Sequence, residues 1–173
     1  MNNLTPEHQA LLSTWQQHVY AEFELKNAEA ALATMTETPH VLLIPSGTGG
    51  TGKEGVWDFY ANHFLPNIPP DIELVPVSET FAQDRIVEEY VVRFTHTLNM
   101  DWMLPGVPAT GRKVEFGLVI IIQFENGKVA SEHFYWDQAT VLSQLGILNA
   151  PVAAAGIASA AKLLELSAQT PGS

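Results

Sequence analysis

The chain has 173 residues, 46% of them hydrophobic, which is enough for one globular domain with its own core. Its net charge is −11 with only eight Lys and Arg residues, so a basic nucleic-acid-binding surface is absent and an anionic membrane would repel the chain. The lack of cysteine excludes disulfides, thiolate-bound zinc and a thiol nucleophile.

The N-terminal residues MNNLTPEHQ contain neither a basic nor an apolar segment, and no later run of about 18 apolar residues predicts a transmembrane helix. We therefore expect a cytoplasmic protein without a membrane or nucleic-acid partner. Thr5 is a helix N-cap candidate, followed by Pro6 and Glu7. The helix carries an apolar stripe at spacing four, formed by Leu11, Trp15, Val19 and Phe23.

The helical pattern continues to about Met35, and we expect a break near Lys26 and Asn27. His18 lies off the apolar stripe, so we expect its side chain to be solvated.

A glycine-rich segment, PSGTGGTGKEG, lies between a predicted strand at 38–45 and a predicted helix at 56–64. It fits two phosphate-binding patterns, G-x-G-x-x-G and G-x-x-x-x-G-K. However, Glu54 stands where a P-loop has the Ser or Thr that holds magnesium, and the elements that follow are strands rather than alternating strands and helices. We interpret the segment as a loop that leads into a helix.

Four predicted strands follow, at 72–81, 85–98, 114–124 and 129–137. Tight connections at 82–84 and 125–127 predict two antiparallel hairpins, the second with an Asn126-Gly127 turn. Between the hairpins, residues 99–112 predict an irregular loop whose Asp101 and Trp102 suit the rim of a pocket. Helices first and an antiparallel sheet later predict an α+β fold.

Asp137 at the end of the last strand is the leading catalytic candidate. His133, Tyr135 and Asp137 share one parity and so point to one face of the sheet. A carboxylate whose pKa is raised by apolar walls can act as a general acid or base. The alternative is that Asp137 caps the helix that follows, and the two roles are not exclusive. Glu132, on the opposite face of this strand, is expected to be structural or interfacial.

His96 shares the parity of Tyr90 near the end of its strand and could orient a substrate carbonyl or pair with Asp137. The alternative is a histidine bonded to the backbone. Three strand histidines with nearby acids could bind a metal, but none shows ligand spacing such as H-x-H, so we predict no metal site. The candidate substrate-binding residues are Tyr135, His133, Trp102, Asp101, Tyr90, Phe116 and His40.

The segment YWDQATVLSQLGIL resembles the end of a SnoaL-like protein, a polyketide-cyclase-related branch of the NTF2-like superfamily. The resemblance extends back through FTHTLNMDWMLPGVPATGRKVEF and HVLLIPSGTGGTGKEGVWDFYANHF, and covers roughly residues 11–148. It implies an NTF2-like cone, in which a curved, mostly antiparallel sheet wraps around N-terminal helices and encloses a pocket. The domain would span residues 1–148. Residues 149–173 would be an extra C-terminal helix, packed on the same domain or on a partner subunit.

In SnoaL-like cyclases the acid at this motif position is a general acid/base on an activated carbon acid, so the resemblance implies this role for Asp137. We predict a cofactor-independent cyclase or isomerase that acts on a small hydrophobic or carbonyl-bearing molecule. The alternative is a non-catalytic protein that binds a small hydrophobic ligand on the same fold. A related branch opens epoxides with an Arg-x-Asp motif, but Arg93 here is followed by Phe94 and Thr95. We also expect a homodimer, because residues 119–122 are apolar on both strand faces.

Overall fold

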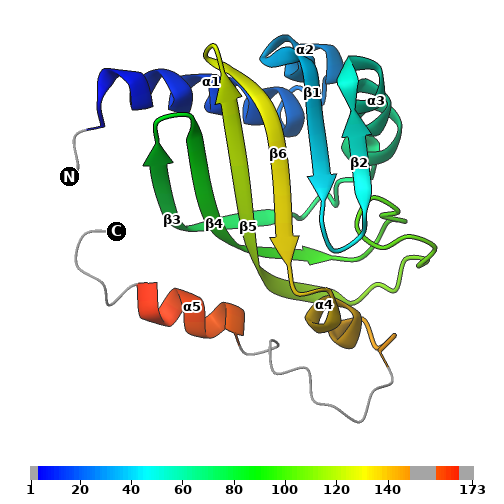
Figure 1. Cartoon of the computed structure of the whole chain (residues 1–173). Coiled ribbons are helices and arrows are strands. Elements are labelled where there is room, and N and C mark those ends of the chain that lie inside the picture. The colour runs from blue at the N-terminus through cyan, green and yellow to red at the C-terminus, as the bar shows by residue number, and fades with distance from the viewer. Residues whose placement is uncertain (1–3, 149–158, 168–173) are drawn as a thin grey trace.

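A computed structural model describes residues 4–148 and 159–167 of the chain. Its centre is a six-stranded curved sheet in the order β2-β1-β6-β5-β4-β3 (Figure 1). The β1–β6 pairing is parallel and the other four pairings are antiparallel. The strands are β1 (Met35–Leu43), β2 (Thr48–Thr51), β3 (Glu73–Ala82), β4 (Arg85–Thr95), β5 (Lys113–Glu125) and β6 (Lys128–Trp136). This arrangement confirms the predicted NTF2-like α+β fold and both hairpins.

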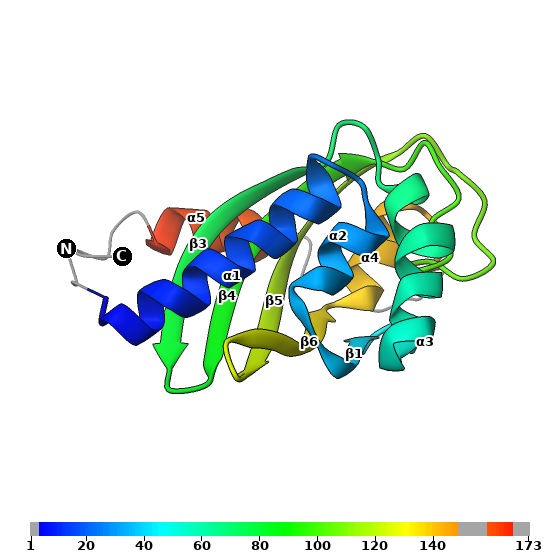
Figure 2. The same cartoon turned by 90° about the horizontal axis from the view of Figure 1, so that it is seen from above.

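The first helix, α1 (Pro6–Phe23), crosses above the curved sheet (Figure 2). Thr5 caps it by accepting a hydrogen bond from the His8 backbone N–H at 3.2 Å. The predicted break occurs at Lys26, whose φ is +47°. Asn27 then caps the short helix α2 (Ala28–Ala33) through the Ala30 N–H.

The predicted loop in the glycine-rich segment is partly wrong, because residues 48–51 form the edge strand β2. The helix that follows, α3 (Gly52–Asp58), begins earlier than predicted and continues through a π-helical turn, η1 (Phe59–Phe64), and a 3-10 turn, η2 (Leu65–Asn67). A Cβ on Gly49 would overlap the Val41 carbonyl, and one on Gly50 would overlap the Gly55 carbonyl. These glycines therefore permit close backbone packing.

The sheet has a buried inner face and a partly exposed outer face. Along β5, burial alternates residue by residue, and the buried parity is formed by Val114, Phe116, Leu118, Ile120, Ile122 and Phe124. These side chains form the core together with buried residues of α1 and α3. The inner face and the helices thus form the walls of a cone.

Two helices follow the sheet within the part of the chain that the structure describes. The helix α4 (Gln138–Gln144) starts directly after β6. The helix α5 (Ser159–Ser167) approaches the outer face at Gly117, where a Cβ would lie 3.8 Å from Leu163. The expected C-terminal helix also included Ile157, which lies outside the described residues. No helix within residues 4–148 and 159–167 is long and apolar enough to cross a membrane.

Candidate functional site

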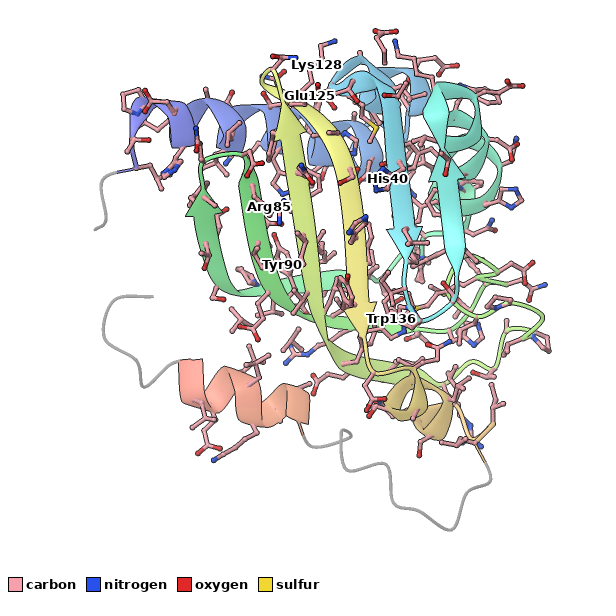
Figure 3. The ribbon with its side chains drawn as sticks, in the orientation of Figure 1. His40, Arg85, Tyr90, Glu125, Lys128 and Trp136 are labelled. Carbon is pink, nitrogen blue, oxygen red and sulfur yellow. The ribbon has the colours of Figure 1, made fainter. Side chains whose placement is uncertain are left out.

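The cone encloses a cavity of about 90 Å³ between α1, η1, the loop after β4 and the inner face of the sheet. Eleven of its 22 lining residues are aromatic. Among them, Tyr90 comes from β4 and Trp136 from the end of β6 (Figure 3). Most of the wall is therefore hydrophobic. A small apolar ligand could pack against it without leaving its own polar groups unpaired.

The cavity wall contains two carboxyl groups, Glu22 from α1 and Glu88 from β4. None of its described lining residues is Lys, Arg or His. Both glutamates are almost fully buried, with residue exposures of 4% and 6%. The ionisable groups of the wall are thus acids and tyrosines in an apolar environment.

Glu22 belongs to a buried polar cluster, defined here as His18, Glu22, Tyr60 and Glu132. His18 Nε2 lies 3.4 Å from Glu22 Oε1 and 3.1 Å from Glu132 Oε1. The Tyr60 hydroxyl donates a hydrogen bond to Glu132 Oε1 at 2.9 Å. The cluster joins α1, η1 and β6, and Glu22 and Tyr60 connect it to the cavity.

The hydrogen bonds of the cluster favour the imidazolium form of His18. The Thr34 hydroxyl donates to the Ala31 carbonyl, so His18 Nδ1, 2.7 Å from Thr34 Oγ1, must donate to that oxygen. His18 Nε2 faces two carboxyl groups and therefore also donates. Burial alone would lower the pKa of His18, but the charges of Glu132 and Glu22 outweigh it and raise the pKa to about 10.

Burial raises the pKa of Glu22, and the charge and hydrogen bond of His18 only partly oppose this shift. A carboxyl group with a raised pKa can both accept and return a proton closer to neutral pH. The donor atoms of His18, Glu22 and Glu132 are also close enough to hold a metal ion. However, the imidazolium and the Tyr60 hydroxyl already occupy Glu132 Oε1.

Glu88 differs from Glu22 because it has no cationic partner among the described residues. Its Oε2 atom is buried and has no hydrogen-bond partner within the described part of the chain. Burial raises its pKa, and nearby Trp15 and Tyr90 oppose the shift through hydrogen bonding. Of the two carboxyl groups in the cavity wall, Glu88 is therefore the one that, as far as the structure describes the chain, lacks a cationic partner and has an oxygen without a hydrogen bond.

The structure brings three of the predicted site residues together. Tyr90 comes from β4, Trp102 from the loop that follows β4, and Phe116 from β5. All three line the cavity. The Trp102 indole N–H donates to the Asn67 carbonyl at 3.2 Å, which fixes the ring. Neighbouring Asp101 is exposed and accepts a hydrogen bond from the Gly106 N–H at 3.0 Å.

His40, His133 and Tyr135 lie on the outer face and are not among the residues that line the cavity. Their role in substrate binding stays a prediction. His133 and Tyr135 do share one face as predicted, but their neighbours Phe134 and Trp136 point into the cavity instead. His40 Nε2 on β1 (Figure 3) lies 2.8 Å from His133 Nε2 on the neighbouring strand β6. Tyr135 is 40% exposed. Strand parity predicts which residues share a face but does not say which face is concave.

Asp137 caps α4, as the alternative prediction proposed. Its carboxylate accepts hydrogen bonds from the Ala139 and Thr140 N–H groups and from the Thr140 hydroxyl, at 3.0, 3.3 and 2.6 Å. The Thr140 hydroxyl is the main reason that the pKa of Asp137 is lowered. Asp137 is not among the residues that line the cavity. These contacts do not support its predicted role as a general base.

His96 is buried but is not among the cavity-lining residues. Its Nδ1 lies 3.1 Å from Thr110 Oγ1, and its backbone N–H donates to the Arg112 carbonyl. Burial lowers the pKa of His96. The Thr110 backbone N–H also donates to His96 Nδ1 at 3.3 Å, which agrees with the alternative prediction of a histidine bonded to the backbone.

The sequence interpretation missed Glu22 and Glu88 and predicted that His18 would be solvated. His18 is instead fully buried. The signal was a second helical repeat, in which Leu11, Trp15, His18 and Glu22 follow one another at spacings of four, three and four. For Glu88, the signal was its shared strand parity with Tyr90.

Comparisons with known proteins identify a matching protein family and solved structures of similar fold. The family model for the SnoaL-like polyketide cyclase matches residues 14–145. A candidate SnoaL-like polyketide cyclase from Jannaschia sp. CCS1 is similar in structure, with a TM-score of 0.68 and 18% identity over 86% of this chain and 99% of that one. No curated protein sequence matches the chain.

Two Streptomyces structures are also similar. IdmH, a candidate polyketide cyclase from Streptomyces antibioticus, has a TM-score of 0.55 and 22% identity over 79% of this chain and 98% of that one. AclR, a candidate hydroxylase from Streptomyces galilaeus, has a TM-score of 0.61 and 19% identity over 93% of this chain and 96% of that one. At these identities, the structural likeness demonstrates a shared fold.

Proposed function

The chain belongs to the SnoaL-like polyketide cyclase family, and on this basis we propose that it is a cofactor-independent cyclase or isomerase of a small carbonyl compound. The observation that carries the proposal is the position of Glu22. Its carboxyl group lies on the wall of an apolar cavity and is backed by the buried His18 imidazolium and Glu132. We assign the acid/base role to Glu22 rather than to Asp137, because Asp137 is committed to the cap of α4.

The proposed reaction is a proton transfer at the carbon next to the carbonyl. The ionised Glu22 carboxylate takes that proton, and the electron pair moves onto the carbonyl oxygen to form an enolate. Tyr90 lines the same cavity and its pKa is raised by burial, so its hydroxyl stays protonated and can donate to the enolate oxygen. Protonated Glu22 then returns the proton, to another carbon in an isomerisation or to the new alkoxide in an aldol cyclisation.

The test is hydrogen–deuterium exchange at the α-carbon of cyclopentanone in D₂O, followed by proton NMR. This reaction needs only enolisation, so it does not require the natural substrate. We expect the protein to accelerate the exchange, and Glu22→Gln to reduce that acceleration by about 100-fold or more while keeping the fold.

Asp137→Asn is the matched control, because it removes a carboxylate of similar chemistry outside the cavity. We expect this variant to keep the exchange activity and to lose only part of the helix cap. An Asp137→Asn variant that loses the exchange, with Glu22→Gln unaffected, would return the catalytic role to Asp137.

A non-catalytic small-ligand protein is the second candidate function. The lowered pKa of Asp137 favours it, because the carboxylate at the family's motif position is a weak base. In this case, the cavity would bind small apolar ligands without accelerating the exchange of cyclopentanone.

A further inference from the structure

We propose that the cavity binds a small organic ammonium group, which packs against the aromatic walls and forms an ion pair with Glu88. This inference rests on the ligand-binding role proposed above and adds the chemical class of the ligand. It would make the natural ligand a compound with a cationic amine.

The first argument is the unbalanced charge of the cavity wall. Glu22 already has a cationic partner, because His18 Nε2 lies 3.4 Å away. Glu88 has none in the described residues, and its register partner across the β3–β4 pairing is another acid, Glu79. An anionic ligand would be repelled here, whereas a cation would supply the missing opposite charge.

The second argument is the unpartnered oxygen of Glu88. A buried acceptor without a hydrogen bond costs free energy, and native proteins contain few such atoms. Glu88 Oε2 is such an atom within the described residues, and its side chain lines the cavity. An ammonium N–H placed in the cavity would donate to it, whereas a hydrocarbon would leave the oxygen unpaired.

The third argument is the aromatic wall. The negative faces of Trp, Tyr and Phe rings attract organic cations, most strongly where water is excluded. Trp15 and Tyr90 lie next to Glu88 and line the cavity with it. The carboxylate and the rings therefore favour the same charge at the same place.

The size of the cavity limits the group that it can enclose. On the measure used for such cavities, one water molecule needs roughly 10–15 Å³. A cavity of about 90 Å³ is several times larger and has room for a compact organic group. A compact alkylammonium group fits this limit.

The experiment compares tert-butylammonium with tert-butanol, which has nearly the same shape and no charge. Binding is followed by tryptophan fluorescence, since Trp15, Trp102 and Trp136 line the cavity. The remaining tryptophan, Trp57, donates to Glu29 on the surface and provides a constant background. We expect the wild-type protein to bind the ammonium about tenfold or more tightly than the alcohol.

The variants Glu88→Gln and Glu89→Gln identify the residue responsible. Glu89 is next to Glu88 on β4, but its carboxylate accepts from Ser78, outside the cavity. We expect Glu88→Gln to lose the preference for the ammonium and Glu89→Gln to keep it. If Glu88→Gln does not fold, the wild-type comparison of the two ligands still tests the preference for a cation.

Equal wild-type affinity for the two ligands would overturn the ammonium inference and leave the proposed function intact. A preference that survives in Glu88→Gln would overturn the assignment to Glu88. If neither ligand binds, the inference fails. A lack of cyclopentanone exchange with a clear preference for the ammonium would overturn only the proposed reaction.

Discussion

His18 is a buried imidazolium whose charge is maintained by residues from three parts of the chain. Glu22 is one helical turn away on α1, Glu132 comes from β6, and Thr34 follows α2. Moving two carboxyl groups and an imidazole out of water costs several kcal/mol per charge unless they pair. The cluster is therefore sensitive to any change that removes one proton.

We predict that the free energy of unfolding decreases as the pH rises from 6.5 towards 10. The pKa of His18 is raised from 6.5 to about 10 in the folded protein. Its stabilising contribution is therefore complete below pH 6.5 and is lost as the pH rises through the folded value. The raised pKa of Glu22 acts in the same direction. The total loss should be on the order of a few kcal/mol.

Urea unfolding at a series of pH values measures this effect. The double variant His18→Gln/Glu22→Gln should give a flatter profile, because neither replaced side chain titrates. His63→Gln is the control, since His63 is an exposed histidine with a side-chain exposure of 54%. Parallel profiles for wild type and the double variant would contradict the prediction.

At the scale of residues, the sequence could predict the aromatic part of the site but not its acids. Tyr90, Trp102 and Phe116 were predictable because large aromatic residues near a predicted pocket are usually part of its wall. Whether an acid is buried depends on partners from other elements. For His18, the choice between two overlapping helical stripes depended on Glu132, far away in the sequence.

At the scale of elements, the backbones of β2 and α3 approach each other closely at Gly50 and Gly55. Its glycines follow a phosphate-binding pattern, but the structure gives them a packing role. The α-carbon of Gly50 faces the backbone of Gly55, where a Cβ would overlap the Gly55 carbonyl. In contrast, a Cβ on Gly55 would lie 3.8 Å from the backbone of Gly50, an ordinary van der Waals distance.

We predict opposite effects of alanine at these two glycines. Gly50→Ala should lower the free energy of unfolding by about 2 kcal/mol or more, because the backbones of β2 and α3 must move apart. Gly55→Ala should be neutral or stabilising by up to about 1 kcal/mol, because alanine favours the helix. Chemical denaturation of both variants measures the difference. Similar losses in both would show that the close approach of β2 and α3 is not the cause.

The order of the strands was predictable where local turns determine it. The Asn126-Gly127 turn predicted the β5–β6 hairpin, and both residues have the positive φ that such a turn requires, +52° and +74°. The parallel β1–β6 pairing was not predicted from the residues, because no local turn specifies it. The concave side of β6 was also hidden, since aromatic side chains lie on both of its parities, Phe134 and Trp136 on one and Tyr135 on the other.

At the scale of the whole molecule, the outer face of the sheet carries large hydrophobic side chains. Leu42 on β1 and Tyr135 on β6 are 36% and 40% exposed, and Ile44, in the turn after β1, is 42% exposed. The helix α5 covers a different part of this face, near Gly117. Exposed apolar groups that lie together on a sheet favour association with another protein surface.

We predict that this face forms a symmetric homodimer. Sedimentation velocity at micromolar concentration should show a dimer, and Leu42→Glu should shift the population towards monomer because it places a charge in the apolar contact. Tyr20→Glu is the control, since Tyr20 is 55% exposed on α1. A wild-type monomer, or equal effects of the two variants, would contradict the prediction.

The parallel pairing of β1 and β6 also determines the order of events during synthesis on the ribosome. β1 ends at Leu43, but its neighbour β6 ends only at Trp136. Bringing such distant segments together is slow, because a long stretch of chain must be ordered first. Until β6 has been synthesised, the core around Trp15 is incomplete and His18 lacks its contact with the Glu132 carboxylate. The N-terminal half of the nascent chain must therefore avoid aggregation until β6 has been synthesised.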